Sequence, residues 1–186
     1  LYRTMCKFAK ERKLDDEFDL TLETTHHGPV LTKPTLYIEI GSTEKEWGRD
    51  DVADCWTESI AYVLGLSGTN SSSLGDSQDV MIGFGGGHYA PRHKAIILDS
   101  NINLGHVIAN YSLLFDDFDI SSDPSGPWIS SVVAAVESTK ISFPNSNIFA
   151  HLDRKSFKGW QRSAIIAKLD ELGIEVRRGK EILQRE

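Results

Sequence analysis

Apolar and polar residues alternate in two stretches of the N-terminal third of the chain, residues 18–23 and residues 35–40. Alternation with a period of two puts every second side chain on one face, which is typical of a half-buried strand. We therefore expect two strands here. In the second, one face would carry Leu36, Ile38 and Ile40, and the other Tyr37 and Glu39.

The remaining pattern predicts helices interleaved with short strands. The basic stretch at residues 3–14 predicts a first helix. Apolar residues at helical spacing predict three more, from Thr43 to Gly65, at about 128–140 and at 157–172. Thr43 and Glu46 have capping-box spacing, and Gly65 suits a helix end. Residues 67–78 and 116–127 are predicted loops. Short apolar runs predict strands at residues 80–84, 95–98, 106–109, 147–150 and 174–176.

This order of elements predicts the class of fold. Strands interleaved with helices are typical of an α/β sandwich around a central sheet, and short connections between neighbouring strands favour a mixed sheet. We expect a single domain over residues 1–186. Because the chain starts Leu1-Tyr2-Arg3-Thr4, without an initiator Met or an apolar signal core, we expect a fragment of a longer protein.

Composition indicates the cellular compartment in which the protein is expected. No apolar stretch approaches the roughly 20 residues that a membrane span needs, so we expect no membrane partner. The two cysteines, Cys6 and Cys55, are too far apart for a CxxC site, which favours a reducing, cytoplasmic setting in which both fill apolar space. The oligomeric state stays open.

Charge argues against extensive binding of nucleic acid, and we expect no DNA partner. The net charge is −7, whereas phosphate contacts need Lys and Arg. Local basic clusters could still bind one end of a nucleic-acid partner. Solvated surface charge is the simpler interpretation of each cluster. The clusters are Arg92, His93 and Lys94; Arg154, Lys155, Lys158 and Arg162; and Arg177, Arg178 and Lys180.

Glu39 is a candidate catalytic residue because the predicted strand would partly bury it between Ile38 and Ile40. A buried carboxylate needs a cation, a metal or hydrogen-bond donors, or else it holds a proton. Glu39 is therefore a candidate metal ligand or general base. A structural salt bridge, for example to Lys33, is the alternative.

Four of the six histidines fall in two short segments that follow predicted strands, His26-His27 and His88 to His93. Imidazole is a common metal ligand and a proton carrier near neutral pH. Adjacent side chains in an extended chain point in opposite directions, so His26 and His27 would not bind one metal together. A purely structural histidine stays the alternative for each of them.

Gly85, Gly86 and Gly87 offer backbone N–H groups to an anion or a developing oxyanion. The run resembles a dinucleotide fingerprint only loosely, because His88 replaces the third glycine and Tyr89-Ala90-Pro91 is a poor helix opening. No P-loop and no Gly-x-Ser-x-Gly motif is present, and Cys55 lies in a predicted helix. An activated water is the best available nucleophile.

Five ordered motifs resemble those of the D-aminoacyl-tRNA deacylases of archaea and plants. They are residues 23–29 (ETTHHGP), 34–43 (PTLYIEIGST), 85–93 (GGGHYAPRH), 105–106 (GH) and 151–160 (HLDRKSFKGW), the later ones closer to the plant branch. The resemblance covers essentially the whole chain.

The resemblance implies an enzyme that hydrolyses the ester between a D-amino acid and the 3′ end of tRNA, which is chiral proofreading. It also implies Zn²⁺, a fold related to phosphorylase and peptidyl-tRNA hydrolase, and a further N-terminal portion. Removal of aldehyde-modified aminoacyl groups is a second activity linked to the family.

The residues and the resemblance together predict a site. We expect His27, Glu39 and His88 at the reacting centre. The metal would be bound from among His26, His27, Glu39, His88 and His106. The tRNA substrate, held by its acceptor end, would contact Gly85, Gly86, Gly87, Tyr89, Arg92, His93, Arg154, Lys155 and Lys158.

Three alternatives stay open. The same His and Glu residues would suit a zinc peptidase or amidohydrolase. A module that only binds tRNA or phosphate would use the glycine run without chemistry. The ribose hydroxyl of the tRNA could itself drive ester hydrolysis, with the histidines shaping the pocket.

Overall fold

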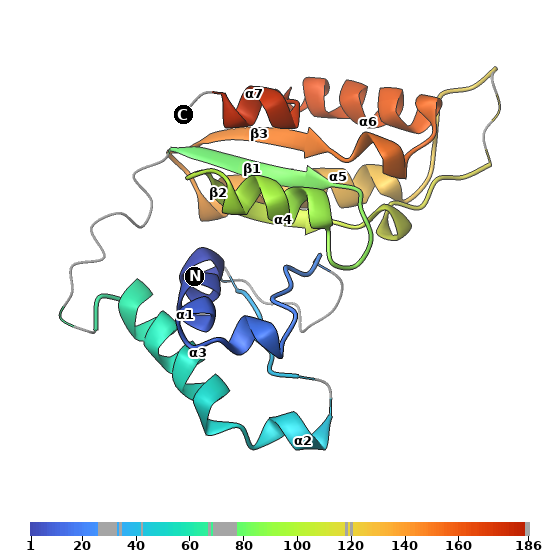
Figure 1. Ribbon diagram of the computed structural model, residues 1–186. Helices are drawn as coiled ribbons and strands as arrows, with labels where there is room; N and C mark the ends of the chain where they lie inside the picture. Colours follow the sequence, from blue (N-terminus) through green and yellow to red (C-terminus); the bar gives the residue numbers. More distant parts are fainter. Residues whose placement is uncertain are drawn as a thin grey trace. The chain divides into compact units, whose positions relative to one another are not determined.

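The computed structural model describes residues 1–25, 33, 35–41, 43–66, 68, 78–117, 119 and 121–184 (Figure 1). Contacts within the chain divide it into two compact units, one from Leu1–Thr21 and Val30–Asp76, the other from Leu22–Pro29 and Ser77–Glu186. The expectation of one domain over residues 1–186 stays a prediction. Within the described residues, no helix combines the length and apolar character needed to cross a bilayer.

The first unit is a small helical cluster. It contains α1 (Tyr2–Glu11), the 3-10 turn η1 (Leu14–Asp16), α2 (Glu44–Trp47) and α3 (Asp50–Val63). Helices α1 and α3 pack together, and Cys6 and Cys55 are buried free thiols in their contact, as predicted. The apolar core consists of Met5, Cys6, Phe8, Ala9, Leu14, Val52 and Cys55.

The two predicted strands of the first third are wrong. The described residues of 18–23 and 35–40 are irregular, and residues 35–39 are exposed. Alternation stabilises a strand only where a partner strand pairs with it and one face is covered. Phe18 and Leu20 of the first stretch pack against the helical core, and so does Ile40 of the second, whereas Leu36 and Ile38 are exposed.

The predicted helix from Thr43 to Gly65 is interrupted at Gly48, which separates α2 from α3. The capping box is also wrong, because the Thr43 hydroxyl donates to the Glu46 carboxylate instead of capping the backbone. The predicted end is confirmed, since Gly65 follows α3 with φ of 70°.

The second unit is built on a four-stranded sheet in the order β2-β1-β3-β4. The strands are β1 (Asp79–Phe84), β2 (Asn103–Ile108), β3 (Asn147–Leu152) and β4 (Glu175–Val176). Every described pairing is parallel, so the α/β class is confirmed and the mixed sheet is wrong. Parallel neighbours need crossover connections, and helices supply them here.

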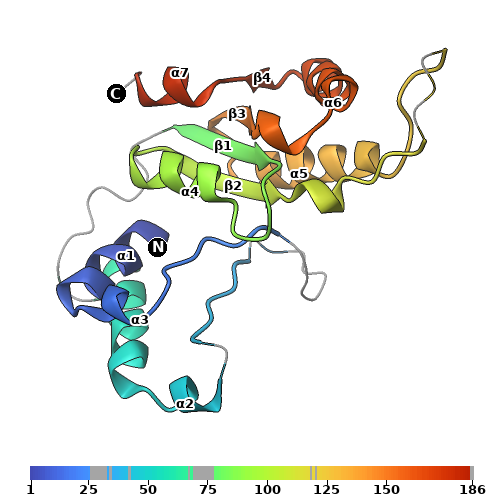
Figure 2. The ribbon, with the colours of Figure 1, turned by 45° about the vertical axis from the view of Figure 1, so that its right-hand side comes forward.

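Helices cover both faces of this sheet. They are α4 (Pro91–Leu98), α5 (Trp128–Ser142), α6 (Gly159–Glu171) and α7 (Gly179–Leu183). Figures 1 and 2 show α4 on one side of the sheet and α5 on the other, where α5 also contacts α6. Ile82, Phe84, Ala150 and Leu152 join the α5 and α6 core, whereas the intervening strand residues face α4 and α7.

The predicted helices of the second unit are confirmed, and so are its predicted strands, with one exception. Residues 95–98 belong to α4 rather than to a strand. Pro91 at the first helical position and Ala90 in the left-handed region (φ 37°) start this helix. The interpretation of Tyr89-Ala90-Pro91 as a poor helix opening is therefore wrong, because proline is favoured at the first helical position.

A buried pair of imidazoles joins α4 to the sheet. His93 is fully buried and its Nε2 lies 3.3 Å from the His151 carbonyl oxygen. The two rings meet edge to face with centroids 5.0 Å apart. Burial lowers the pKa of His93, and burial together with His93 lowers the pKa of His151 to about 4.

Gly83→Ala should destabilise the second unit, because a Cβ on Gly83 would lie 2.6 Å from His93 Cδ2. Overpacking of this kind costs about 1–3 kcal/mol. Gly179→Ala is the matched control, since its Cβ would make only ordinary contacts with the same layer, 3.6 Å from Ile96. Urea unfolding of both variants measures the difference, and equal stabilities would contradict this packing.

Acid should destabilise the fold through His151. Its folded pKa of about 4 lies below the unfolded value, so the unfolded chain binds the extra proton as pH falls from about 6.5 to 4. At pH 5 the loss is about 2 kcal/mol relative to neutral pH, with Asp153 opposing and Arg92 reinforcing the shift. Unfolding of wild type and His151→Asn at pH 5 and 7 should show a smaller pH dependence in the variant.

Candidate functional site

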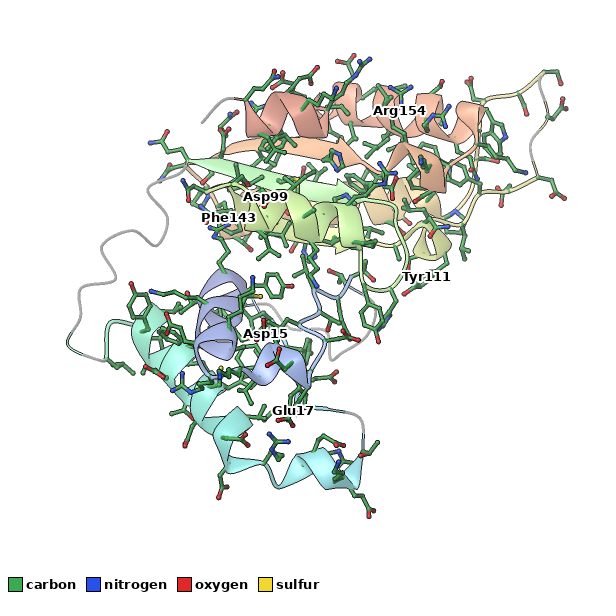
Figure 3. The ribbon with its side chains drawn as sticks, viewed as in Figure 1. Asp15, Glu17, Asp99, Tyr111, Phe143 and Arg154 are labelled. Atoms are coloured by element: carbon green, nitrogen blue, oxygen red, sulfur yellow. The ribbon has the colours of Figure 1, made fainter. Side chains whose placement is uncertain are left out.

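Loops gather at the carboxyl edge of the sheet, where β1, β2 and β3 end. The neighbours β1 and β3 lead to α4 and α6, on opposite faces, so their loops diverge. Open parallel sheets bind ligands at such a switch point. Figure 3 places Tyr111 and Arg154 toward this edge, and Asp99 and Phe143 toward the other.

The glycine turn after β1 is fixed by hydrogen bonds to both neighbouring loops. Gly85 N donates to the Ile108 carbonyl (2.8 Å), and Gly86 N donates to Ser156 Oγ (2.7 Å). The Gly86 carbonyl accepts from Asn110 N (3.2 Å). With φ of 95° and 79°, Gly85 and Gly86 adopt a backbone that favours glycine.

This arrangement limits what the predicted glycine contacts can do. The amides of Gly85 and Gly86 are already donated, so within the described part of the chain Gly87 is the glycine of the run left to donate to a ligand. A Cβ on Gly87 would meet nothing within 4 Å, which leaves open space beside it.

His88 contacts a carboxylate and a phenol. Its Nε2 lies 3.4 Å from Glu23 Oε1, and its Nδ1 lies 3.4 Å from the Tyr111 hydroxyl. The exposed fractions of the His88 and Glu23 side chains are 39% and 33%, so a substrate can reach them. The segment before His26 is held in place by Thr24 N, which donates to the His88 carbonyl (2.9 Å).

Glu23 and Tyr111 were not predicted as site residues. Glu23 opens the first motif, ETTHHGP, so a signal for it was present in the sequence. Tyr111 lies in the 3-10 turn η2 (Asn110–Ser112), which has no distinguishing pattern.

His106, a predicted metal ligand, lies on β2 with both ring nitrogens near hydroxyl groups. Nδ1 is 3.2 Å from Thr25 Oγ1, and Nε2 is 3.1 Å from Ser138 Oγ. Burial lowers the pKa of His106, which favours the neutral ring. These contacts fix the ring without leaving a nitrogen for a metal.

The loop after β3 carries the predicted phosphate-binding cations. Arg154 and Lys155, in the 3-10 turn η3 (Arg154–Ser156), and Lys158, before α6, are exposed and form no ion pair with another described residue. Asp153 holds the loop by accepting from Lys155 N (3.2 Å), and it pairs with Arg92 Nε (3.1 Å).

Two other predicted cationic positions have structural roles. Arg162 Nη1 donates to the Arg154 and Phe157 carbonyls and so holds the same loop. Arg177 is buried, pairs with Asp79 and Glu175, and lies 4.2 Å from the Phe149 ring centroid. Arg177 is therefore not available to a phosphate.

Three predicted site residues differ in their placement. Glu39 is exposed in an irregular segment of the first unit and forms no ion pair with Lys33 among the described residues, so the buried strand that motivated its role is wrong. His93 is buried and presents no surface to a substrate. His26 and His27 lie outside the described residues.

The donor set for zinc is incomplete in the part of the chain that the structure describes. Those residues contain no group of three or more His, Cys, Asp or Glu side chains suited to a metal ion. His88 brings one carboxylate neighbour, Glu23. The described donors are therefore too few to form the predicted Zn²⁺ site by themselves.

What remains at the edge is a set of groups suited to activating water. A carboxylate facing one nitrogen of an imidazole orients the ring and leaves the lone pair on the other nitrogen. Gly87 N–H can stabilise a developing negative charge, and exposed cations lie on the adjoining loop. This chemistry fits hydrolysis of an ester on an anionic carrier.

Known proteins resemble this chain over nearly all of its length. A D-aminoacyl-tRNA deacylase of Arabidopsis thaliana is 44% identical over 185 residues, covering 94% of this chain and 58% of the relative. One of Methanosarcina mazei is 38% identical over 179 residues, covering 96% and 50%. The chain thus spans between one half and three fifths of the length of these relatives.

A solved structure shares the fold. The crystal structure of a conserved protein of unknown function matches with a TM-score of 0.68 and 26% identity, over 98% of this chain and 57% of that one. The family model described as D-aminoacyl-tRNA deacylase matches residues 1–177. The chain therefore belongs to the D-aminoacyl-tRNA deacylase family.

Proposed function

We propose that the protein hydrolyses the ester bond between a D-amino acid and tRNA, releasing the D-amino acid and free tRNA. Membership of the family supports the reaction. The observation that carries it is His88, placed between Glu23 and Tyr111 at the carboxyl edge of the sheet.

His88 is the proposed base. Glu23 accepts from Nε2–H and so holds the tautomer in which Nδ1 has its lone pair. A water on Nδ1 attacks the ester carbonyl carbon while its proton passes to Nδ1. The imidazolium then gives that proton to the departing ribose oxygen, and the C–O bond of the ester breaks. The Tyr111 hydroxyl lies 3.4 Å from Nδ1, which is long for a hydrogen bond. A water can therefore take the place of the hydroxyl at Nδ1.

The glycine turn and the cations would act on the substrate rather than on the water. Gly87 N–H would donate to the oxyanion that forms when the carbonyl is attacked. Arg154, Lys155 and Lys158 would hold phosphates of the tRNA acceptor end. Tyr89 and Arg92 follow His88, Tyr89 in the same turn with its ring against the His88 ring and Arg92 in the first turn of α4.

We also propose that the protein is related to the phosphorylase and peptidyl-tRNA hydrolase folds and that it is cytoplasmic. The described sheet with helices on both faces supports only the layered α/β architecture that this relation requires. Two buried free thiols support a reducing, cytoplasmic setting.

Loss of the base should abolish most of the activity while leaving the fold intact. His88→Ala and Glu23→Gln should lower kcat on D-Tyr-tRNA, by roughly 10²–10⁴-fold for His88 and less for Glu23, which only orients the ring. The pair is too exposed to contribute more than about 1 kcal/mol to stability. Thermal unfolding should therefore be unchanged.

Glu137→Gln on α5 is the matched carboxylate control, since Glu137 pairs only with Lys140 among the described residues. An unchanged rate in His88→Ala would favour catalysis by the ribose hydroxyl.

Equal rates on D-Tyr-tRNA and L-Tyr-tRNA would remove the chirality claim. Cleavage of small amides without tRNA would favour a peptidase, and binding without product would favour a module that only docks tRNA.

Zinc stays a prediction of the family resemblance, and a chelator tests it. The expected result is a loss of deacylation that added Zn²⁺ reverses. Any further ligand to the Zn²⁺ would then come from outside the described residues. A rate indifferent to the chelator would remove zinc and leave the roles of His88 and Glu23 unaffected.

A further inference from the structure

Two exposed tyrosines flank His88. Tyr89 and Tyr111 expose 52% and 50% of their surface. The rings of His88 and Tyr89 meet edge to face with centroids 4.8 Å apart, and the Tyr111 hydroxyl lies 3.4 Å from His88 Nδ1. Two aromatic rings therefore border the proposed base from different loops, one after β1 and one after β2.

The exposure of these rings is not required by the fold. Neither belongs to the apolar core of the second unit, which is made from the strands and from α5 and α6. Unpaired bases stack on exposed aromatic side chains, and this is the usual way in which proteins bind single-stranded RNA.

The charges nearby fit the same kind of ligand. The Gly86 carbonyl accepts from Asn110, next to Tyr111, and the Gly86 amide donates to Ser156, next to Lys155. The aromatic residues and the exposed cations Arg154 and Lys155 thus lie on loops bonded to one glycine. Because the chain carries a net charge of −7, cations gathered here favour an anion at this edge.

We infer that Tyr89 and Tyr111 form a stacking site for the unpaired bases at the 3′ end of the RNA substrate, while Arg154 and Lys155 hold the adjoining phosphates. This inference rests on the proposed function and names how its substrate is gripped. A base stacked beside His88 carries its ribose, and hence its ester, to the proposed base. Double-stranded RNA offers no free base face and would bind through phosphates alone.

Binding of uncharged RNA tests the inference without any chemistry. The probe is a single-stranded RNA tetranucleotide ending in CCA, titrated against the full-length protein at fixed salt, with the same sequence paired in a blunt hairpin for comparison. Tyr89→Ala and Tyr111→Ala should each raise the Kd for the single strand roughly 5- to 150-fold. Tyr89→Phe and Tyr111→Phe should bind as wild type, because the ring is kept.

Salt dependence separates the stacking role from the phosphate role. Arg154→Ala should lower the slope of log K against log salt by about 0.7 per lost phosphate contact, whereas the tyrosine variants should leave the slope unchanged. Ile141→Ala removes another exposed apolar side chain, on α5, and should leave the Kd unchanged.

The outcomes separate this inference from the proposed reaction. Unchanged affinity in both alanine variants, equal binding of single strand and hairpin, or no binding by wild type would each overturn the stacking site, whatever the deacylase activity. Selective binding that the alanine variants lose, in a protein that releases no D-amino acid, would sustain the site and overturn the reaction. Tyr89→Leu and Tyr111→Leu, which keep apolar bulk but lack a ring, should bind as weakly as the alanine variants.

Discussion

The backbone of Gly86 is the point on which the carboxyl edge of the sheet depends. Its amide and carbonyl are each bonded to a different neighbouring loop, one after β3 and one after β2. A Cβ at this residue would approach Ala90 Cα to 3.3 Å, and φ of 79° disfavours any other residue. Three loops that would otherwise move independently are thereby fixed relative to the sheet.

The consequence for chemistry is that His88 is positioned by the backbone rather than by burial. Its contacts with Glu23 and Tyr111 are long and partly exposed, so they add little to stability. Their role is orientation, and the turn supplies the rigidity. The buried imidazoles of His93 and His151 behave oppositely, since they contribute to packing and are withdrawn from solvent.

The sequence predicted the second unit better than the first for a physical reason. The runs at β1 and β3 are buried on both faces, and a continuous apolar run is a strong signal for a parallel strand. Residues 35–40 show that alternation alone is weaker, because the covering layer it requires is missing from the described residues. The run 95–98 is apolar enough to resemble a strand, but it lies in a helix that starts at Pro91, where proline is favoured.

The site was predictable where a residue type was unusual and not where it was ordinary. The glycine run and His88 stood out, but the amides of Gly85 and Gly86 are used within the protein, which only coordinates reveal. Glu39 stood out through a strand that does not form. Other contacts at the site are made by common loop residues, Tyr111 with His88, Ser156 with Gly86 and Asp153 with Arg92. The partners are 23 to 70 positions apart in the chain, and no local pattern encodes such pairings.

The ion pair of Arg177 with Asp79 bears on how the chain is made. These partners are 98 positions apart, so at ribosomal speeds roughly 5–20 s separate their synthesis. The central strand β1 emerges first, while the outer strand β4 and the guanidinium that covers Phe149 emerge last. During that interval the nascent sheet has an uncovered edge, and closure of this unit must await its final strand.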